Sequence, residues 1–96
     1  MDRQQTIALL GRSKPELARQ FGVTRLRLFG STARDAATER SDVDVLVAFD
    51  GPATSERYFG VQFYLEDLLG VPVDLVTEKA LREELRPFVE KECVDV

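Results

Sequence analysis

Two segments decide the fold of this chain: LFGSTAR at residues 28–34 and SDVDVLV at residues 41–47. The first completes the stretch Val23–Phe29, in which charged and apolar residues alternate at a spacing of two, the pattern of a strand with one solvated face. The second begins with two carboxylates and continues as an apolar run to Phe49, which predicts a central strand. A glycine turn, a short helical turn and a polar loop are expected between the two strands.

Helices and a third strand are predicted around these segments. In the N-terminal part we expect two short helices that meet near Gly11, or one kinked helix, with Asp2 as N-cap and Gly22 as the C-terminal stop. The later expected elements are a helix at Arg57–Leu69, a strand at Val71–Val76, and a helix at Thr77–Val89 broken around Pro87. We expect Tyr58, Phe59, Phe63 and Phe88 to be core residues. The pattern predicts an α/β (α+β) fold with a small sheet, as a single domain over residues 1–96.

Length and charge restrict the class of protein. The chain has 96 residues, 44% of them hydrophobic, which suits one domain with a buried core. Its net charge is −4, whereas nucleic-acid binding needs clustered positive charge, so we expect no direct nucleic-acid binding. A template-dependent polymerase fits poorly, because such enzymes carry added basic domains.

Missing residue types exclude several mechanisms. There is no histidine, which removes histidine triads, histidine general bases and most structural zinc sites. Cys93 stands alone, so the chain cannot form an internal disulfide. No apolar run approaches the roughly 20 residues of a membrane span, and the N-terminus lacks a signal-peptide pattern. We therefore expect a cytoplasmic protein without membrane contact, whose catalysis uses carboxylates, hydroxyls, Arg, Lys and backbone.

Three aspartates are candidate metal ligands. Asp42 and Asp44 are two residues apart at the start of a strand, so their side chains point to the same side, roughly 6.6 Å apart along it. Such carboxylates repel one another unless a cation lies between them, and Mg²⁺ takes carboxylate, water and phosphate oxygens. If the strand containing Asp74 pairs with the strand after Asp42, Asp74 can join a second metal and accept a proton from an attacking hydroxyl.

Gly30 and Ser31 are candidate phosphate-binding residues. A strand that ends in glycine and turns into a helix leaves backbone N–H groups pointing outward, and the serine hydroxyl adds a donor. Arg34, one turn on, could reach a phosphate oxygen. Carboxylates that hold a metal beside a phosphate site are what phosphoryl or nucleotidyl transfer requires.

These two segments resemble the nucleotidyltransferase signature of the DNA polymerase β superfamily, and more narrowly the minimal nucleotidyltransferase (MNT) domains encoded beside HEPN-domain partners. The resemblance extends from the helix before Gly22 to Asp74, with no departure at the motif positions. It implies the polymerase β-like fold with a mixed sheet. It also implies that Gly30 and Ser31 bind a nucleotide triphosphate, that Asp42 and Asp44 bind Mg²⁺, as two ions, and that Asp74 completes the metal site.

The family also implies an activity and a partner. Its antitoxin members transfer AMP from ATP to a tyrosine of a HEPN ribonuclease toxin and so silence it, which implies a hetero-oligomer with the toxin. The alternative is an inactive nucleotidyltransferase fold that neutralises a toxin by covering it. Interpretations without a catalytic role also remain. In these, Asp42 and Asp44 form the solvated start of a strand, Gly30 forms an ordinary turn, and Asp74 and Arg34 form surface ion pairs.

Overall fold

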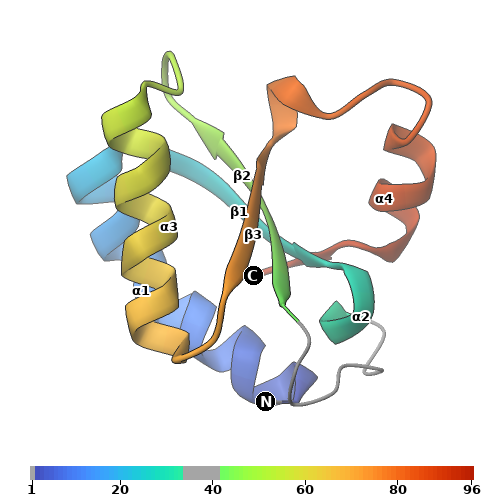
Figure 1. The fold of residues 1–96 in the computed structure, drawn as a ribbon, viewed down its shortest axis with the longest axis horizontal. Coiled ribbons are helices and arrows are strands. Elements are labelled where there is room, and N and C mark those ends of the chain that lie inside the picture. The colour runs from blue at the N-terminus through green and yellow to red at the C-terminus, as the bar shows by residue number, and fades with distance from the viewer. Residues whose placement is uncertain (1, 34–41) are drawn as a thin grey trace.

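A four-stranded mixed sheet forms the centre of the fold (Figure 1). The computed structural model describes residues 2–33 and 42–96. The strand order is β3-β2-β1-β4, with β1 at Val23–Phe29, β2 at Val43–Phe49, β3 at Val73–Thr77 and β4 at Val94–Asp95. Strand β1 is antiparallel to β2 and β4, whereas β2 and β3 are parallel. The mixed sheet and the internal place of β2 are as predicted.

The N-terminal segment is one helix, α1, at Arg3–Phe21, so of the two expected arrangements the pair of short helices is wrong. Asp2 forms a capping box with Gln5, and Gly22 ends the helix in the left-handed conformation, with φ of 72°. Ser13 lies within this helix, and its hydroxyl donates to the carbonyl of Leu10 at 2.7 Å. The helix continues through Pro15, whose missing N–H removes only one backbone hydrogen bond.

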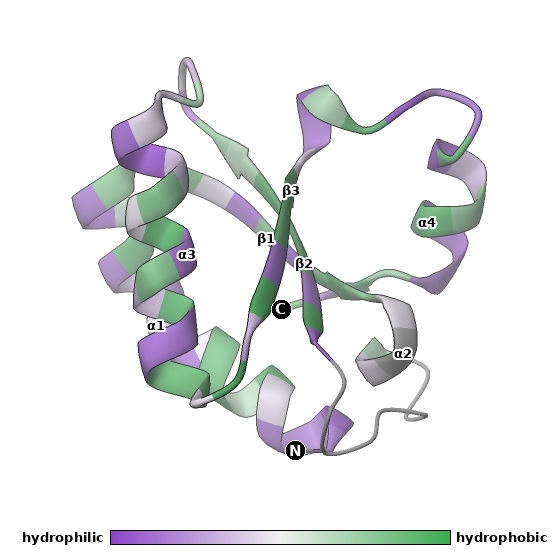
Figure 2. Cartoon of the chain, viewed as in Figure 1, coloured by the Kyte–Doolittle hydropathy of each residue, from purple (hydrophilic) through white to green (hydrophobic). Residues whose placement is uncertain are grey.

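Helices α1 and α3 cover one face of the sheet, and α3 spans Ser55–Leu69 (Figure 1). The core lies between these helices and the alternate residues of β1, β2 and β3, which the period of two directs to the same face. Figure 2 shows the central strands as mainly hydrophobic and the helices as mixed. The fully buried core residues include Leu10 and Leu17 of α1, Leu26 and Leu28 of β1, Val45 and Val47 of β2, and Val61 and Leu65 of α3. In the described ranges, no helix is both long and apolar enough to cross a membrane.

The aromatic residues differ from the prediction. Tyr58 is half-buried, but Phe59, Phe63 and Phe88 are 49%, 63% and 71% exposed. In α3 the side chains of Val61, Leu65 and Leu69 fill the core, so Phe59 and Phe63 project away from the sheet, while Phe88 lies on the exposed surface of α4. Expecting these three phenylalanines in the core was therefore wrong.

The segment after β3 is also different from the prediction. A 3-10 turn, η1, spans Glu78–Ala80, and a helix, α4, begins only at Arg86 and ends at Glu92. Pro87 lies in the first turn of α4, where its missing N–H costs nothing, and so it begins a helix rather than breaking one. The chain then adds β4, which the sequence did not predict, to the outer edge of β1.

Candidate active site

The strand register brings Asp44 and Asp74 together. Asp44 is the second residue of β2 and Asp74 the second of β3, and the two are direct partners in the parallel pairing. Adjacent strands lie about 4.8 Å apart, and side chains at paired positions point to the same face. Their neighbours Val43 and Val73 are buried in the core, so both carboxylates lie on the face opposite α1 and α3.

Asp42 lies just before β2, two residues from Asp44, and it is exposed. The backbone there is tied to the next strand, because the Val43 amide donates to the carbonyl of Pro72 at 3.0 Å. Asp74 is exposed as well. Although the other residues of β3 are mainly apolar, the strand is buried on one face only, so the Asp74 carboxylate is not enclosed in the core.

Gly30 lies against the side chain of Asp44. Its φ is +74°, a left-handed conformation that L side chains rarely adopt. A Cβ atom at this position would lie 2.8 Å from Cγ of Asp44 and would overlap the carboxylate. The pairing of Phe29 with Asp44 in β1 and β2 produces this approach. Glycine is thus required here both for the turn and for the room that the carboxylate takes.

The other candidate phosphate ligands follow Gly30 directly. Gly30–Ala33 forms the short helix α2, which contains Ser31, while Arg34 and the following residues up to Ser41 lie outside the described residues. Thr32, next to Ser31, is 1% exposed, and its hydroxyl has no hydrogen-bond partner among the residues described. The order of elements places Ser31 one residue from the glycine that touches Asp44.

The residues present fit a divalent cation by their chemistry. The three candidates are all carboxylates, the ligands that Mg²⁺ prefers; Asp44 and Asp74 share one face at the same end of β2 and β3, and Asp42 directly precedes β2. In the part of the chain that is described, no three acidic or cysteine side chains are already gathered as a ligand set. The fold therefore pairs Asp44 with Asp74 across neighbouring strands, without the three aspartates being gathered around one point.

The same face of the sheet carries an ionic cluster that sequence reasoning missed. Arg27 lies 3.5 Å from Glu78 and 3.4 Å from Asp95, and Arg25 contacts the same two carboxylates at 3.8 and 3.2 Å. Hydrogen bonding by Arg25 lowers the pKa of Asp95 below its ordinary value. No local signal could reveal this cluster, because Glu78 and Asp95 come from η1 and the two-residue strand β4.

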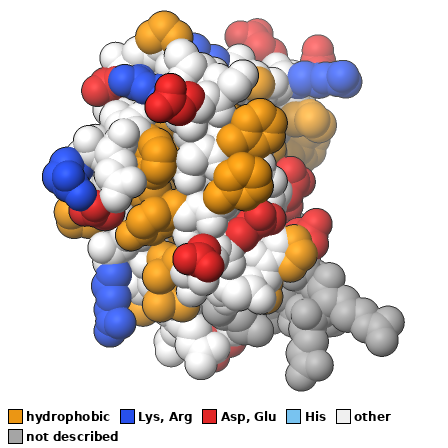
Figure 3. Space-filling model, turned by 60° about the vertical axis from the view of Figure 1, so that its left-hand side comes forward, with side chains coloured by type: hydrophobic (Ala, Val, Ile, Leu, Met, Phe, Trp, Pro, Cys, Tyr) orange, Lys and Arg blue, Asp and Glu red, His pale blue; other side chains and the backbone are white. Residues whose placement is uncertain are grey.

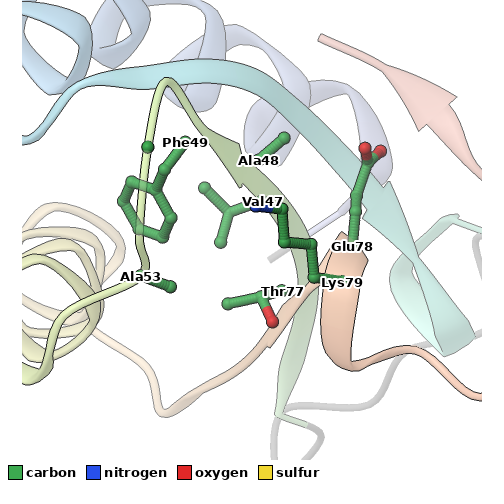
Figure 4. Close-up of a pocket in the computed structure, with 8 residues that line it drawn as sticks. Val47, Ala48, Phe49, Ala53, Thr77, Glu78 and Lys79 are labelled. Atoms are coloured by element: carbon green, nitrogen blue, oxygen red, sulfur yellow. The ribbon is translucent and has the colours of Figure 1, made fainter.

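A small cavity of about 120 Å³ lies at the opposite end of the sheet, at the C-terminal ends of β2 and β3. Figure 4 shows Val47, Phe49 and Ala53 around it, with the Glu78 carboxylate pointing away. The lining is mainly apolar and contains none of the three candidate aspartates. We therefore place the chemistry at the carboxylates and not at this cavity.

A mixed sheet with this register, carrying aspartates on neighbouring strands beside a glycine turn, is the arrangement of the nucleotidyltransferases. Comparison with protein families agrees with that class. Residues 10–96 match the nucleotidyltransferase domain, and the chain belongs to this family of enzymes, as its two signature segments predicted.

Curated relatives match most of the chain. The protein adenylyltransferase MntA of Thermococcus cleftensis is 39% identical over 89 residues, which are 93% of this chain and 90% of that protein. A candidate protein adenylyltransferase of Methanocaldococcus jannaschii is 41% identical over 86 residues, 86% of this chain and 82% of the other.

Solved structures show the same fold. A candidate minimal nucleotidyltransferase has a TM-score of 0.81 and 39% identity, and covers 100% of this chain and 97% of its own. A chain from the complex of tri-AMPylated Shewanella oneidensis HEPN toxin with MNT antitoxin has a TM-score of 0.66 over 97% of this chain and 70% of that chain. The identity there is 19%, so this likeness concerns the fold alone.

Proposed function

We propose that this protein is a Mg²⁺-dependent antitoxin that transfers AMP from ATP to a tyrosine of a HEPN-domain toxin and thereby neutralises it. The observation that carries the proposal is the position of Asp44, which pairs with Asp74 across the parallel strands and lies against Gly30. The proposed metal ligands thus lie next to the turn that we propose binds phosphate. The similarity to protein adenylyltransferases supports the choice of a protein acceptor.

Each candidate residue has a role in this proposal. Asp42, Asp44 and Asp74 hold the metal, and Gly30, Ser31 and Arg34 bind the triphosphate. Bound Mg²⁺ would neutralise phosphate charge and orient the α-phosphate. Asp74 is exposed and free of the core, so it can accept the proton of the tyrosine hydroxyl. The tyrosine oxygen then bonds to the α-phosphorus, and pyrophosphate leaves.

The exposed position of Asp74 suits a macromolecular acceptor. The site is not enclosed within the described residues: Asp42 and Asp74 are exposed, and the cavity at the other end of the sheet contains neither. A tyrosine on the surface of a folded partner can reach such a site without entering a deep cleft. The chain's acidic balance, with a net charge of −4, agrees with a protein acceptor better than with a nucleic acid.

A transfer assay tests the proposal. The protein is incubated with a HEPN-domain partner, Mg²⁺ and ATP labelled at the α-phosphate, and the intact mass of the partner is measured. We expect label and mass to increase on the partner by whole AMP units, and the modified tyrosine to be identified by peptide mapping. EDTA should abolish transfer. A partner that binds stably without gaining mass would contradict transfer and would leave the protein as a binding module.

A further inference from the structure

The outward face of α3 carries an exposed pair of aromatic rings. Phe59 and Phe63 are stacked, with ring centroids 6.1 Å apart, and are 49% and 63% exposed. Tyr58 packs edge-on against Phe59 at 5.2 Å, and its own hydroxyl donates to the carbonyl of Leu75 at 2.6 Å. The pair is thus held in place before any partner arrives, which reduces the entropy lost on binding.

Exposed carboxylates flank the two rings. Glu56 lies three residues before Phe59 and Asp67 four residues after Phe63, spacings that place all four on one side of the helix. We call these four residues the α3 outer face. The one basic residue of α3, Arg57, is engaged with Asp50 at 2.8 Å. Figure 3 shows hydrophobic side chains interspersed with acidic ones on the side of the molecule that carries α3.

A partner cannot bind at this side by adding a strand to the sheet. The free edge of β3 is occupied by side chains of α3: Gln62 donates to the carbonyl of Val73 at 3.2 Å, and Glu66 accepts from the Val73 amide at 3.0 Å. The carbonyl of Leu75 accepts a hydrogen bond from the Tyr58 hydroxyl. Because these backbone groups are already bonded, binding here must use side chains, as in the packing of one helix on another.

The charges disfavour a second copy of the chain as the occupant. In a two-fold dimer with antiparallel α3 helices, Glu56 of one copy would oppose Asp67 of the other. With parallel helices, each carboxylate would oppose its own counterpart. Both arrangements bring like charges together around the apolar contact, whereas a partner with basic residues on both sides of an apolar seam would complement them.

From these contacts we propose that the α3 outer face is the docking surface for a helix of another protein, one with an apolar seam flanked by Lys or Arg. The proposal goes beyond the transfer reaction, because it concerns binding and stands without nucleotide or metal. Through Gln62 and Glu66 the helix is tied to β3, the strand that contains Asp74. A partner docked on α3 therefore binds a helix that borders this strand, but on the side of the sheet opposite the Asp44 and Asp74 carboxylates.

The test uses the full chain labelled with ¹⁵N and two synthetic helical peptides, without ATP or Mg²⁺. The peptides share one leucine seam, which is flanked by lysines in one and by glutamates in the other. We expect the lysine peptide to shift the amide signals of residues 55–67 and to bind at least roughly tenfold more tightly than the glutamate peptide. Added salt should reduce that ratio.

Variants distinguish binding at the α3 outer face from non-specific hydrophobic binding. The double variant Phe59→Ala/Phe63→Ala should weaken binding of the lysine peptide roughly tenfold or more, while Phe88→Ala should leave it unchanged, although Phe88 of α4 is the more exposed ring. Equal binding of both peptides, or shifts that map outside α3, would overturn the proposal. So would sedimentation showing self-association of the wild-type chain that Phe63→Ala removes, since the occupant would then be a second copy.

Discussion

The backbone of Gly30 and the carboxylate of Asp44 share one small space, in which a Cβ atom on Gly30 would lie 2.8 Å from Cγ of Asp44. The glycine directly follows β1 and the aspartate is the second residue of β2, and the antiparallel pairing of Phe29 with Asp44 brings them together. The proposed phosphate turn and the proposed metal ligand therefore cannot move independently. Any side chain at position 30 must displace the carboxylate.

Gly30→Ala should abolish transfer and lower stability, because it combines a left-handed backbone with an overlap on Asp44. Gly70→Ala is a matched control: φ is +72°, but no atom lies within 4 Å of the added Cβ. The control should lose only the stability that alanine costs in a left-handed backbone conformation, about 1 kcal/mol. Gly30→Ala should lose clearly more. Urea denaturation and the transfer assay measure both. Equal losses of stability in the two variants would show that the overlap with Asp44 does not matter.

Asp44→Asn should reduce transfer by roughly 10²-fold or more, because a neutral amide binds Mg²⁺ poorly. Asp42→Asn should have a similar effect if both residues bind metal, with little loss of stability, because Asp42 is exposed. The measurement is the initial rate over a range of Mg²⁺ concentrations. Glu83→Gln, an exposed change in the loop before α4, should keep the wild-type rate. A wild-type rate in either aspartate variant would remove that residue from the site.

Asp74→Asn should slow the chemical step by about 10²–10⁴-fold, the range for a lost general base. Since Asp74 is exposed, the free energy of unfolding of this variant should lie within about 0.5 kcal/mol of the wild-type value. Single-turnover rates measured at saturating ATP separate this effect from nucleotide binding. A folded variant with an unchanged single-turnover rate would refute the role of Asp74 and move the base to the substrate or to water.

Gly60→Ala should destabilise the protein although alanine favours helices. A Cβ at Gly60 would lie 2.9 Å from Cδ1 of Phe21, so the close contact of α1 and α3 depends on glycine. Overpacking costs typically 1–3 kcal/mol, against a gain of about 1 kcal/mol in helix propensity. Urea denaturation should show a net loss, and a second change, Phe21→Leu, should recover part of it. A more stable Gly60→Ala protein would show that Phe21 moves aside at no cost.

The ion pairs of Asp95 should make stability depend on acid pH. Because Arg25 lowers the pKa of Asp95 in the folded state, its contribution is present above the ordinary pKa of aspartate, about 3.9, and is lost as pH falls through the folded value. Asp95→Asn should cost up to about 1 kcal/mol near neutral pH, since Asp95 is largely exposed. The difference should vanish in strong acid, as measured by urea denaturation. Glu84→Gln is the control, and a difference that persists in strong acid would contradict the ion-pair origin.

Local patterns predicted much of this fold. The bounds of β1 at Val23–Phe29 were predicted from alternation alone, and the end of α1 at Gly22 from glycine placement. The motif also placed Gly30 at a strand end and Asp44 on the next strand. These features depend on residues within one or two turns of chain, so the sequence by itself determines them.

Tertiary contacts decided the rest. The pairing of Asp44 with Asp74 depends on the parallel docking of β2 and β3 across α3, and β4 is strand only because β1 offers an edge. The exposure of Phe59 and Phe63 depends on which stripe of α3 meets the sheet. Periodicity and capping record what neighbours along the chain prefer, whereas register and burial are set by the packing of segments that are distant in sequence, and only the folded structure contains that information.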